Sequence, residues 1–241
     1  MIHLTRKDLK RTRVFLTDGY WRKTVAAVRA LGRMGLKVTV GESTYLAPAF
    51  FSRYCYRRVC TPSPVLQPSH YLDFLEDYLK HHPHQVLIPM EEDTLLLLAQ
   101  NRERFAAITR LPCAAYDSLL FARDKLKVIR KAAALGVPTP KTYGITNIDE
   151  IKTLGRQLQY PVVVKPRVGS GSAGMHYVTE PSQLAPALER VFLSGQLPLV
   201  QERLPPDGAG IGASFLLDQE HQVRASFIHR RIRDCLLYTS D

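Results

Sequence analysis

A lysine followed by a glycine-rich segment is the part of this sequence best suited to chemistry. The run Tyr160–Val178 reads YPVVVKPRVGSGSAGMHYV, and it places Lys165 at the end of an apolar strand. Glycines let a backbone approach a phosphate closely, and the backbone N–H groups can then surround the anion. The lysine adds a compact positive charge on a flexible stem. The segment therefore predicts a phosphate-binding loop, with a flexible hairpin and a solvent-exposed lysine as the structural alternative.

The order of the residues disfavours two common nucleotide motifs. In a Walker A loop the lysine follows the glycines, whereas Lys165 precedes them. In a dinucleotide-binding fingerprint a helix follows the glycines, whereas residues 175–178 are expected to form a strand. Near the N-terminus, Glu42 mimics a ribose-binding acid, but Gly19 supplies only one glycine of that fingerprint. Dinucleotide binding is therefore not expected.

Two further motifs flank the loop. Asp124-Lys125 lies upstream on an expected helix and precedes the turn LGVPTP, whereas LVQERL (residues 199–204) lies downstream as an apolar strand that breaks at two prolines. Together the elements DK…GVPTP, VVVKPRVGSGSAG, LVQERL and the late HRRIRD resemble the ATP-grasp family, in the carboxylate–amine ligase and carbamoyl-phosphate-synthase-like branch. The resemblance extends over residues 1–234.

The resemblance implies a nucleotide site. Lys125 and Lys165 would contact the phosphates, with Lys165 also near the adenine, and the glycine loop would be a mobile flap over the β- and γ-phosphates. Backbone groups of the 199–204 strand would meet the adenine edge. The implied ATP contacts are Lys125, Lys165, Gly169, Ser170, Gly171, Ser172, Ala173, Gly174, Gln201, Glu202, Leu204 and Asp207.

The resemblance also implies catalytic and substrate positions. Arg231 and Arg233 would face the γ-phosphate or an acyl-phosphate intermediate; arginines on the exposed face of a hairpin are the alternative. Glu91 and Glu92 follow the carboxyl end of a strand, where α/β sheets place ligand contacts, and could hold a substrate amine. We favour a simpler interpretation, in which these acids begin the next helix, because its N-terminal dipole stabilises negative charge.

The implied reaction is phosphoryl transfer from ATP to a carboxylate, followed by attack of an amine on the acyl phosphate. Mg²⁺ would neutralise the phosphates, and its ligands are expected beyond Asp234, so the chain as given is expected to bind nucleotide weakly and to be inactive. The expected partners are ATP and small carboxylate and amine substrates, with a homodimer left open. Biotin-carboxylase-type carboxylation is the alternative within enzymes.

Composition and charge limit the other classes of function that the protein could have. The 241 residues have a formal charge of +11 and a pI near 9.6, which favours an anionic partner. Nucleic acid is a second candidate because Arg53–Arg58 alternates arginine with tyrosine, but no known binding module surrounds it. The four cysteines form no CxxC pair. No apolar run is long enough for a membrane span and no signal sequence is visible, so the protein is expected to be cytoplasmic and not membrane-bound.

Hydrophobic periodicity predicts a doubly wound α/β domain followed by an α+β domain. We assign residues 1–112 to a pre-ATP-grasp (Rossmann-like) domain and 113–234 to the ATP-grasp domain, with 113–195 as its first subdomain and 196–234 as the start of its second. Residues 235–241 are expected to be a non-native tail. The expected strands are 13–17, 37–42, 54–60, 85–89, 161–165, 175–178, 198–202, 211–217 and 222–229, the last two as an antiparallel hairpin.

Overall fold

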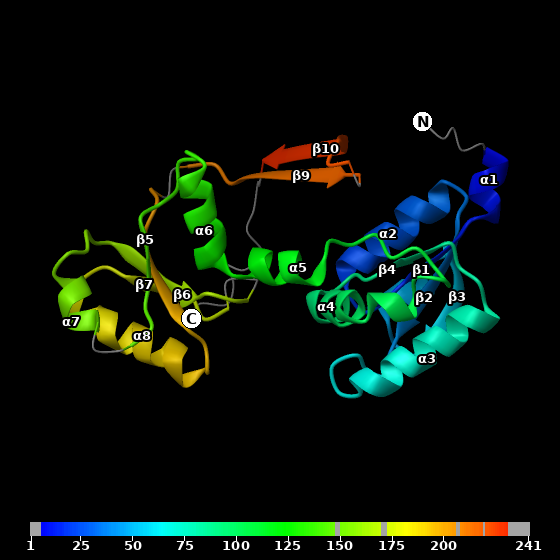
Figure 1. The fold of residues 1–241 in the computed structure, drawn as a ribbon, viewed down its shortest axis with the longest axis horizontal. Coiled ribbons are helices and arrows are strands. Elements are labelled where there is room, and N and C mark those ends of the chain that lie inside the picture. Colours follow the sequence, from blue (N-terminus) through cyan, green and yellow to red (C-terminus); the bar gives the residue numbers. More distant parts are fainter. Residues whose placement is uncertain (1–5, 148–149, 170–172, 206–207, 219, 231–241) are drawn as a thin grey trace. The chain divides into compact units, whose positions relative to one another are not determined.

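The structure is a computed structural model that describes residues 6–147, 150–169, 173–205, 208–218 and 220–230. The chain divides into two compact units, Met1–Leu119 and Leu120–Asp241 (Figure 1). No helix among the described residues is long and apolar enough to cross a membrane. The predicted residues Ser170, Gly171, Ser172, Asp207, Arg231 and Arg233, and the tail at 235–241, lie outside the described part of the chain.

The first unit is built on a parallel sheet of four strands in the order β3-β2-β1-β4. Strands β1 and β2 pair in parallel, with Val14 opposite Val38, as the strand–helix–strand pattern predicts. The elements of this unit are α1 (Arg6–Arg11), β1 (Arg13–Leu16), α2 (Arg22–Arg33), β2 (Lys37–Glu42), η1 (Pro48–Phe51), β3 (Cys55–Cys60), α3 (Pro68–His81), β4 (Val86–Ile88), α4 (Glu92–Gln100) and η2 (Arg102–Arg104).

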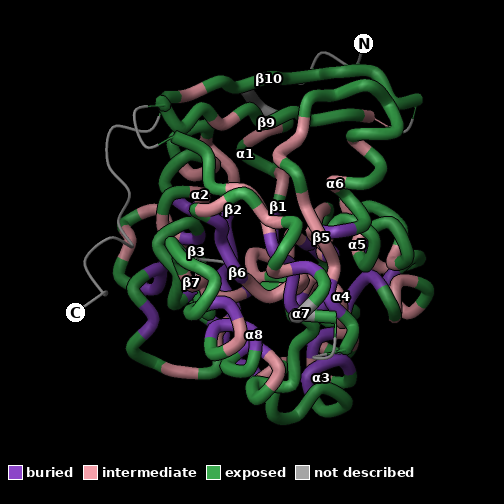
Figure 2. The backbone as a smooth tube through the Cα atoms, turned by 90° about the vertical axis from the view of Figure 1, so that its left-hand side faces the viewer, coloured by how far each residue is buried: buried purple, intermediate pink, exposed green. Residues whose placement is uncertain are grey.

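Helices cover both faces of this sheet because its strands are apolar on both sides. Val14 and Leu16 point to one face and pack in a core with Val28 of α2. Phe15 points to the other face and packs with Leu75 of α3 and with α4. Figure 2 shows β1 and β2 among the buried segments. The doubly wound architecture predicted for the N-terminal half is therefore confirmed.

The second unit contains an antiparallel sheet of four strands in the order β5-β8-β6-β7 and a separate hairpin of β9 and β10. The hairpin is antiparallel, with Phe215 opposite Ser226, as predicted. The elements are α6 (Lys125–Ala134), β5 (Thr142–Gly144), α7 (Glu150–Gly155), β6 (Val162–Pro166), β7 (His176–Val178), η3 (Pro181–Gln183), α8 (Leu184–Leu193), β8 (Pro198–Glu202), β9 (Ile211–Leu217) and β10 (Val223–Arg230), and the division between the units falls inside α5 (Tyr116–Arg123).

One face of this sheet forms the core of the second unit. Val162 and Val164 of β6 pack with Val200 of β8 against Leu184 and Leu188 of α8. Burying side chains of this size contributes about 1.5–3 kcal/mol each. Because side chains alternate along a strand, the residues between these valines must face the other way. That opposite face carries the predicted lysine.

Strand β5 has no counterpart among the predicted strands. Strand β5 reads only TYG, which is too short and too weakly apolar to show a period-two pattern. Its place in the sheet comes from backbone pairing with β8, where Tyr143 lies opposite Val200. Gly144 of β5 is also required by packing, because an added Cβ would lie 2.2 Å from Cδ2 of Leu126 in α6.

Candidate functional site

A row of side chains crosses the second unit's sheet on the face away from α8. Val163 of β6 lies opposite Tyr177 of β7 and opposite Gln201 of β8, and Gln201 lies opposite Thr142 of β5. Lys165 is two residues beyond Val163, so it shares this face. The sheet register thus assembles polar groups from strands that are far apart in the sequence.

A pocket of about 280 Å³ opens on this face. Four of the residues predicted to contact ATP line it together, and they come from two segments of the chain: Lys165, Gln201, Glu202 and Leu204. Its lining residues are Val163, Lys165, Met175, Tyr177, Gln201, Glu202, Arg203 and Leu204. Sequence reasoning did not assign Val163, Met175, Tyr177 or Arg203 to the site. The guanidinium of Arg203 lies 4.8 Å from the centre of the Tyr177 ring, which is a cation–π contact. The two residues are far apart in the sequence, so no local pattern predicts this contact.

Lys165 is held in place by a chain of hydrogen bonds. Its Nζ donates to Oε1 of Gln201 at 2.7 Å, and Nε2 of Gln201 donates to Oγ1 of Thr142 at 2.8 Å. The Thr142 hydroxyl in turn donates to the carbonyl of Pro140 at 2.8 Å. Burial and the nearby charge of Lys125 lower the pKa of Lys165. The side chain is half-buried and oriented, unlike the exposed lysine that a plain hairpin would carry.

Lys125 approaches the start of the glycine loop from another element. It is the first residue of α6, and its Nζ donates to the carbonyl of Gly169 at 2.7 Å and to that of Pro166 at 3.2 Å. Its backbone N–H also donates to the carbonyl of Arg167 at 3.0 Å. The charge of Lys125 is, after burial, the second cause that lowers the pKa of Lys165.

Asp124 ties α6 to the residue that follows Pro166. Its Oδ1 accepts from the backbone N–H of Leu126 at 3.0 Å, which caps the helix. Its Oδ2 pairs with Nη2 of Arg167 at 2.5 Å, with only 12% and 18% of the two side chains exposed. Burial opposes ionisation of Asp124, but the hydrogen bonds from Arg167 and from the helix outweigh it, so the pKa of Asp124 is lowered. Arg167 had no predicted role, because its partner is distant in sequence.

The described ends of the glycine loop have backbone conformations suited to glycine. Gly169 has φ of +126° and Gly174 has φ of +69°, a region that side chains rarely adopt. Ala173 and Gly174 are exposed and lie outside the set of residues that line the pocket. The loop returns directly into β7, which pairs antiparallel with β6 through Val163 and Tyr177. A strand after the loop, as predicted, distinguishes it from the dinucleotide fingerprint.

Glu91 and Glu92 belong to the first unit. Helix α4 begins at Glu92, with Glu91 at its N-cap position, which is the arrangement that the helix-start interpretation expects. The Glu91 carboxylate pairs with Nζ of Lys23 at 2.7 Å. The neighbouring Asp18 accepts from the backbone N–H of Glu91 at 2.9 Å and from Oγ1 of Thr94 at 2.7 Å, and so ties the end of β1 to the start of α4.

The glutamate that follows β2 has a local structural role. Oε2 of Glu42 accepts from the backbone N–H of Tyr20 at 2.9 Å, and Oε1 accepts from the backbone N–H of Ser43 at 2.6 Å. Within the described part of the chain, no group of three or more His, Cys, Asp or Glu side chains is arranged to hold a metal ion.

Comparison with known proteins identifies a domain family for the second unit. Residues 122–236 match the sequence model of the family described as the ATP-grasp domain. The second unit is an ATP-grasp domain. The match covers Lys125, the glycine loop and the β8 strand, so all of the predicted ATP contacts fall inside it.

Curated relatives extend the similarity beyond the ATP-grasp domain. The chain is 28% identical over 186 residues to the formate-dependent phosphoribosylglycinamide formyltransferase of Synechococcus sp. (strain CC9902), which covers 77% of this chain and 44% of that protein. It is 26% identical over 172 residues to the carbamoyl phosphate synthase large chain of Xylella fastidiosa (strain Temecula1), covering 70% of this chain and 16% of that one. The chain therefore spans less than half the length of these relatives.

The fold is shared with solved structures at low sequence identity. The N5-carboxyaminoimidazole synthetase of Staphylococcus aureus, complexed with ADP, superposes with a TM-score of 0.68 at 13% identity, covering 93% of this chain and 55% of that one. Together with the family match, this similarity confirms the predicted fold class.

Proposed function

We propose that the protein binds ATP on the pocket face of the second unit's sheet and takes part in ATP-dependent ligation of a carboxylate to an amine. The observation that carries the proposal is the convergence of Lys165 and Lys125 from different elements at the start of a glycine loop, beside a pocket of about 280 Å³. The carboxylate–amine ligation is proposed from the ATP-grasp family and the curated relatives.

The two lysines are suited to phosphate groups. Burial and, after it, the nearby charge of Lys125 lower the pKa of Lys165. An anion placed between them would offset both effects and favour the charged forms. The carbonyl contacts of Lys125 show that its Nζ already points at the loop that would cover the phosphates.

The end of strand β8, which lines the pocket, offers a backbone group that could bind the adenine. The backbone N–H of Leu204, just beyond β8, has no hydrogen-bond partner among the described residues. It follows Glu202 and Arg203, whose N–H groups donate to the carbonyls of Lys141 at 2.9 Å and Pro161 at 3.2 Å. An adenine ring lying against Val163 and Tyr177 could accept a hydrogen bond from Leu204, while Gln201 fixes the position of Lys165.

In the proposed reaction the substrate carboxylate takes the γ-phosphoryl group of ATP, giving an acyl phosphate and ADP, and an amine then displaces phosphate. Mg²⁺ would neutralise charge on the phosphates. Lys125 and Lys165 would hold the phosphates in line, and a closed loop would exclude water from the intermediate. The role of Arg231 and Arg233 toward the γ-phosphate remains part of this proposal, whereas Glu91 and Glu92 keep the helix-start interpretation.

Nucleotide binding by this chain tests the proposal. Because the chain as given is expected to bind nucleotide weakly, ATP with Mg²⁺ is added at high concentration. We then expect the melting temperature to rise, since a ligand present at 100 times its Kd stabilises the folded state by about 2.7 kcal/mol. Lys165→Met keeps the apolar stem and removes the charge, so it should abolish the rise, as should Lys165→Ala. Lys131→Ala removes an exposed lysine on the last turn of α6 and should leave the rise unchanged.

A melting-temperature rise that persists in both Lys165 variants would contradict the proposed site. Electrophoretic mobility shift with duplex and single-stranded DNA across a salt series gives an independent check. Tight, strongly salt-dependent DNA binding combined with no effect of nucleotide would support the nucleic-acid alternative and overturn the ligase proposal.

A further inference from the structure

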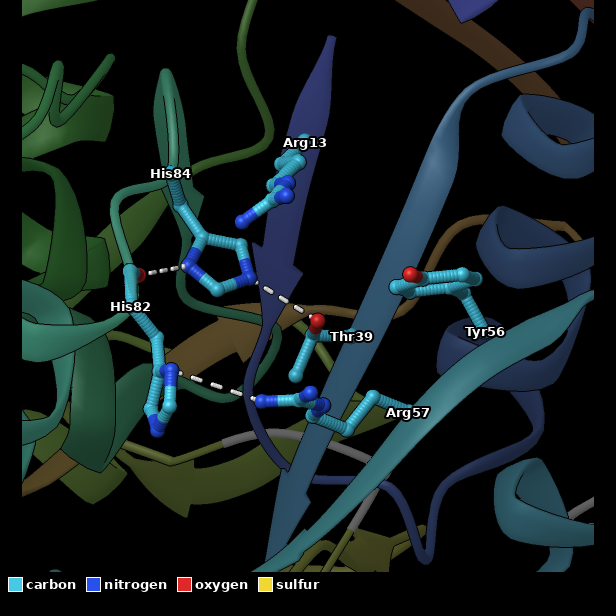
Figure 3. Close-up of a pocket in the computed structure, with 6 residues that line it drawn as sticks. All are labelled: Arg13, Thr39, Tyr56, Arg57, His82 and His84. Carbon is cyan, nitrogen blue, oxygen red and sulfur yellow. Dashed lines mark hydrogen bonds between the residues drawn. The ribbon is translucent and has the colours of Figure 1, made fainter. Parts of the chain in front are cut away.

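A small basic pocket lies in the first unit, on the α3-covered face of its sheet and toward the N-terminal ends of the strands (Figure 3). Its volume is about 50 Å³. The lining residues are Arg13, Thr39, Tyr56, Arg57, His82 and His84. None of them belongs to the predicted ATP site, and the end of the sheet they occupy is opposite to the carboxyl ends, where α/β sheets usually bind ligands.

The strand register brings the two arginines to the same face. Thr39 of β2 lies opposite Phe15 of β1 and opposite Arg57 of β3, so these three side chains form one row. Arg13 is two residues before Phe15 and therefore points to the same side of the sheet. Figure 3 shows the guanidinium groups of Arg13 and Arg57 on either side of the His84–Thr39 pair.

His84 and Thr39 form a fixed, neutral floor. Nδ1 of His84 lies 2.6 Å from the carbonyl of His82, which can only accept, so this nitrogen carries the proton. Nε2 of the neutral ring then accepts from the Thr39 hydroxyl at 2.8 Å. The ring also packs edge-on against Phe15, with 5.6 Å between ring centres. His84 is 4% exposed and Thr39 is 2% exposed, so the floor is buried.

The positive charge around this floor is not neutralised by an ion pair among the described residues. In the described part of the chain neither Arg13 nor Arg57 forms an ion pair with an acidic side chain; Nη1 of Arg57 instead lies 3.4 Å from Nδ1 of His82. Lys37, the register neighbour of Arg13, lies 5.2 Å from the centre of the Tyr56 ring and adds a third cation near the rim.

The end of helix α3 explains only part of this arrangement. Negative partial charge at a helix C-terminus stabilises cations, and His82 is the C-cap of α3. That effect accounts for Arg57 beside His82. It does not account for Arg13, which comes from β1.

We propose that this pocket binds an oxyanion of the phosphate class, held between the guanidinium groups of Arg13 and Arg57. Arginine presents N–H donors in a planar fork that matches phosphate oxygens. A volume of about 50 Å³ exceeds the roughly 30 Å³ share of one water molecule but is far below the 300 Å³ or more of sites for larger ligands. The pocket therefore accommodates a single anionic group, either free phosphate or the phosphate of a monoester whose organic part extends past Tyr56.

Calorimetric titration of the 241-residue protein with inorganic phosphate, at constant ionic strength, tests the site. Arg13→Gln and Arg57→Gln should each weaken binding about tenfold or more, because each removes charge-assisted hydrogen bonds. Arg58→Gln is the matched control: it removes the same charge from the next residue of β3, which points to the other face of the sheet and lies 5.7 Å from the Phe51 ring. Lys165→Met should also retain binding, which separates this site from the proposed ATP site.

An NMR titration of His84, assigned with a His84→Gln variant, locates the bound anion. Burial, together with the positive charges of Arg13, His82 and Arg57, lowers the pKa of His84. A bound anion would offset those charges and raise that pKa. Absence of saturable binding, an equal loss in Arg58→Gln, or binding that leaves the His84 titration unchanged would overturn the proposal. Comparison of inorganic phosphate with glycerol phosphate identifies the source, since a monoester that binds more tightly indicates a metabolite.

Discussion

Replacing Asp124 should loosen the start of α6 in two separable steps. Asp124→Asn keeps a good N-cap but removes the charge that pairs with Arg167, whereas Asp124→Ala removes both. The two side chains are 12% and 18% exposed. Breaking a fully buried pair costs about 3–5 kcal/mol, so we expect about 2–3 kcal/mol at this exposure, and about 1 kcal/mol more for the lost cap in the alanine variant.

Hydrogen exchange of peptides covering residues 125–134 measures this opening locally. Each 1.4 kcal/mol corresponds to a tenfold change in the opening equilibrium, so exchange should quicken by about 30- to 100-fold in Asp124→Asn and about fivefold further in Asp124→Ala. Asp117→Asn, which alters an exposed acid in the first turn of α5, is the control and should leave α6 unchanged.

Two outcomes would refute this reasoning. Equal exchange in the asparagine and alanine variants would show that the cap contributes nothing. A double-mutant cycle of Asp124→Asn with Arg167→Gln that gives no coupling would show that the ion pair contributes nothing. The pH dependence is a further check: because the folded-state pKa of Asp124 is lowered, its stabilisation is present above the unfolded pKa, near 4, and is lost as pH falls through the folded value.

Two other predictions concern packing and ionisation. Gly144→Ala would place a Cβ 2.2 Å from Leu126 and should lower the free energy of unfolding by about 1–3 kcal/mol. The control is Gly155→Ala, whose Cβ would lie 3.5 Å from Leu184 and which should change the free energy of unfolding little. Urea denaturation measures both variants, and equal effects would contradict the structure. Because the pKa of Lys165 is lowered, nucleotide affinity should begin to fall at a lower pH than it would with an ordinary lysine. Lys165→Arg stays charged and should remove that fall in binding titrations from about pH 7 to 10. An unchanged pH profile in this variant would contradict the role of Lys165.

Strongly periodic segments could be predicted from the sequence. The apolar pattern of KVTVGE (residues 37–42), which predicts a strand, follows from burial of its side chains and is a local property of the segment. Strand β5 could not be predicted, because its three residues become a strand only through pairing with β8. Residue Lys165 and the glycine loop were visible because their chemistry lies in one continuous stretch.

Contacts between distant segments required the tertiary structure. The hydrogen-bond chain from Lys165 through Gln201 to Thr142 joins three strands, and its existence depends on their register. The Asp124–Arg167 pair and the basic pocket of Arg13 and Arg57 likewise join residues whose separation in sequence carries no local signal. The sequence by itself predicted a phosphate-binding loop after Lys165 and the fold class of each half of the chain. Only the tertiary structure decided which charges face each other, because folding brings together side chains that no periodicity relates.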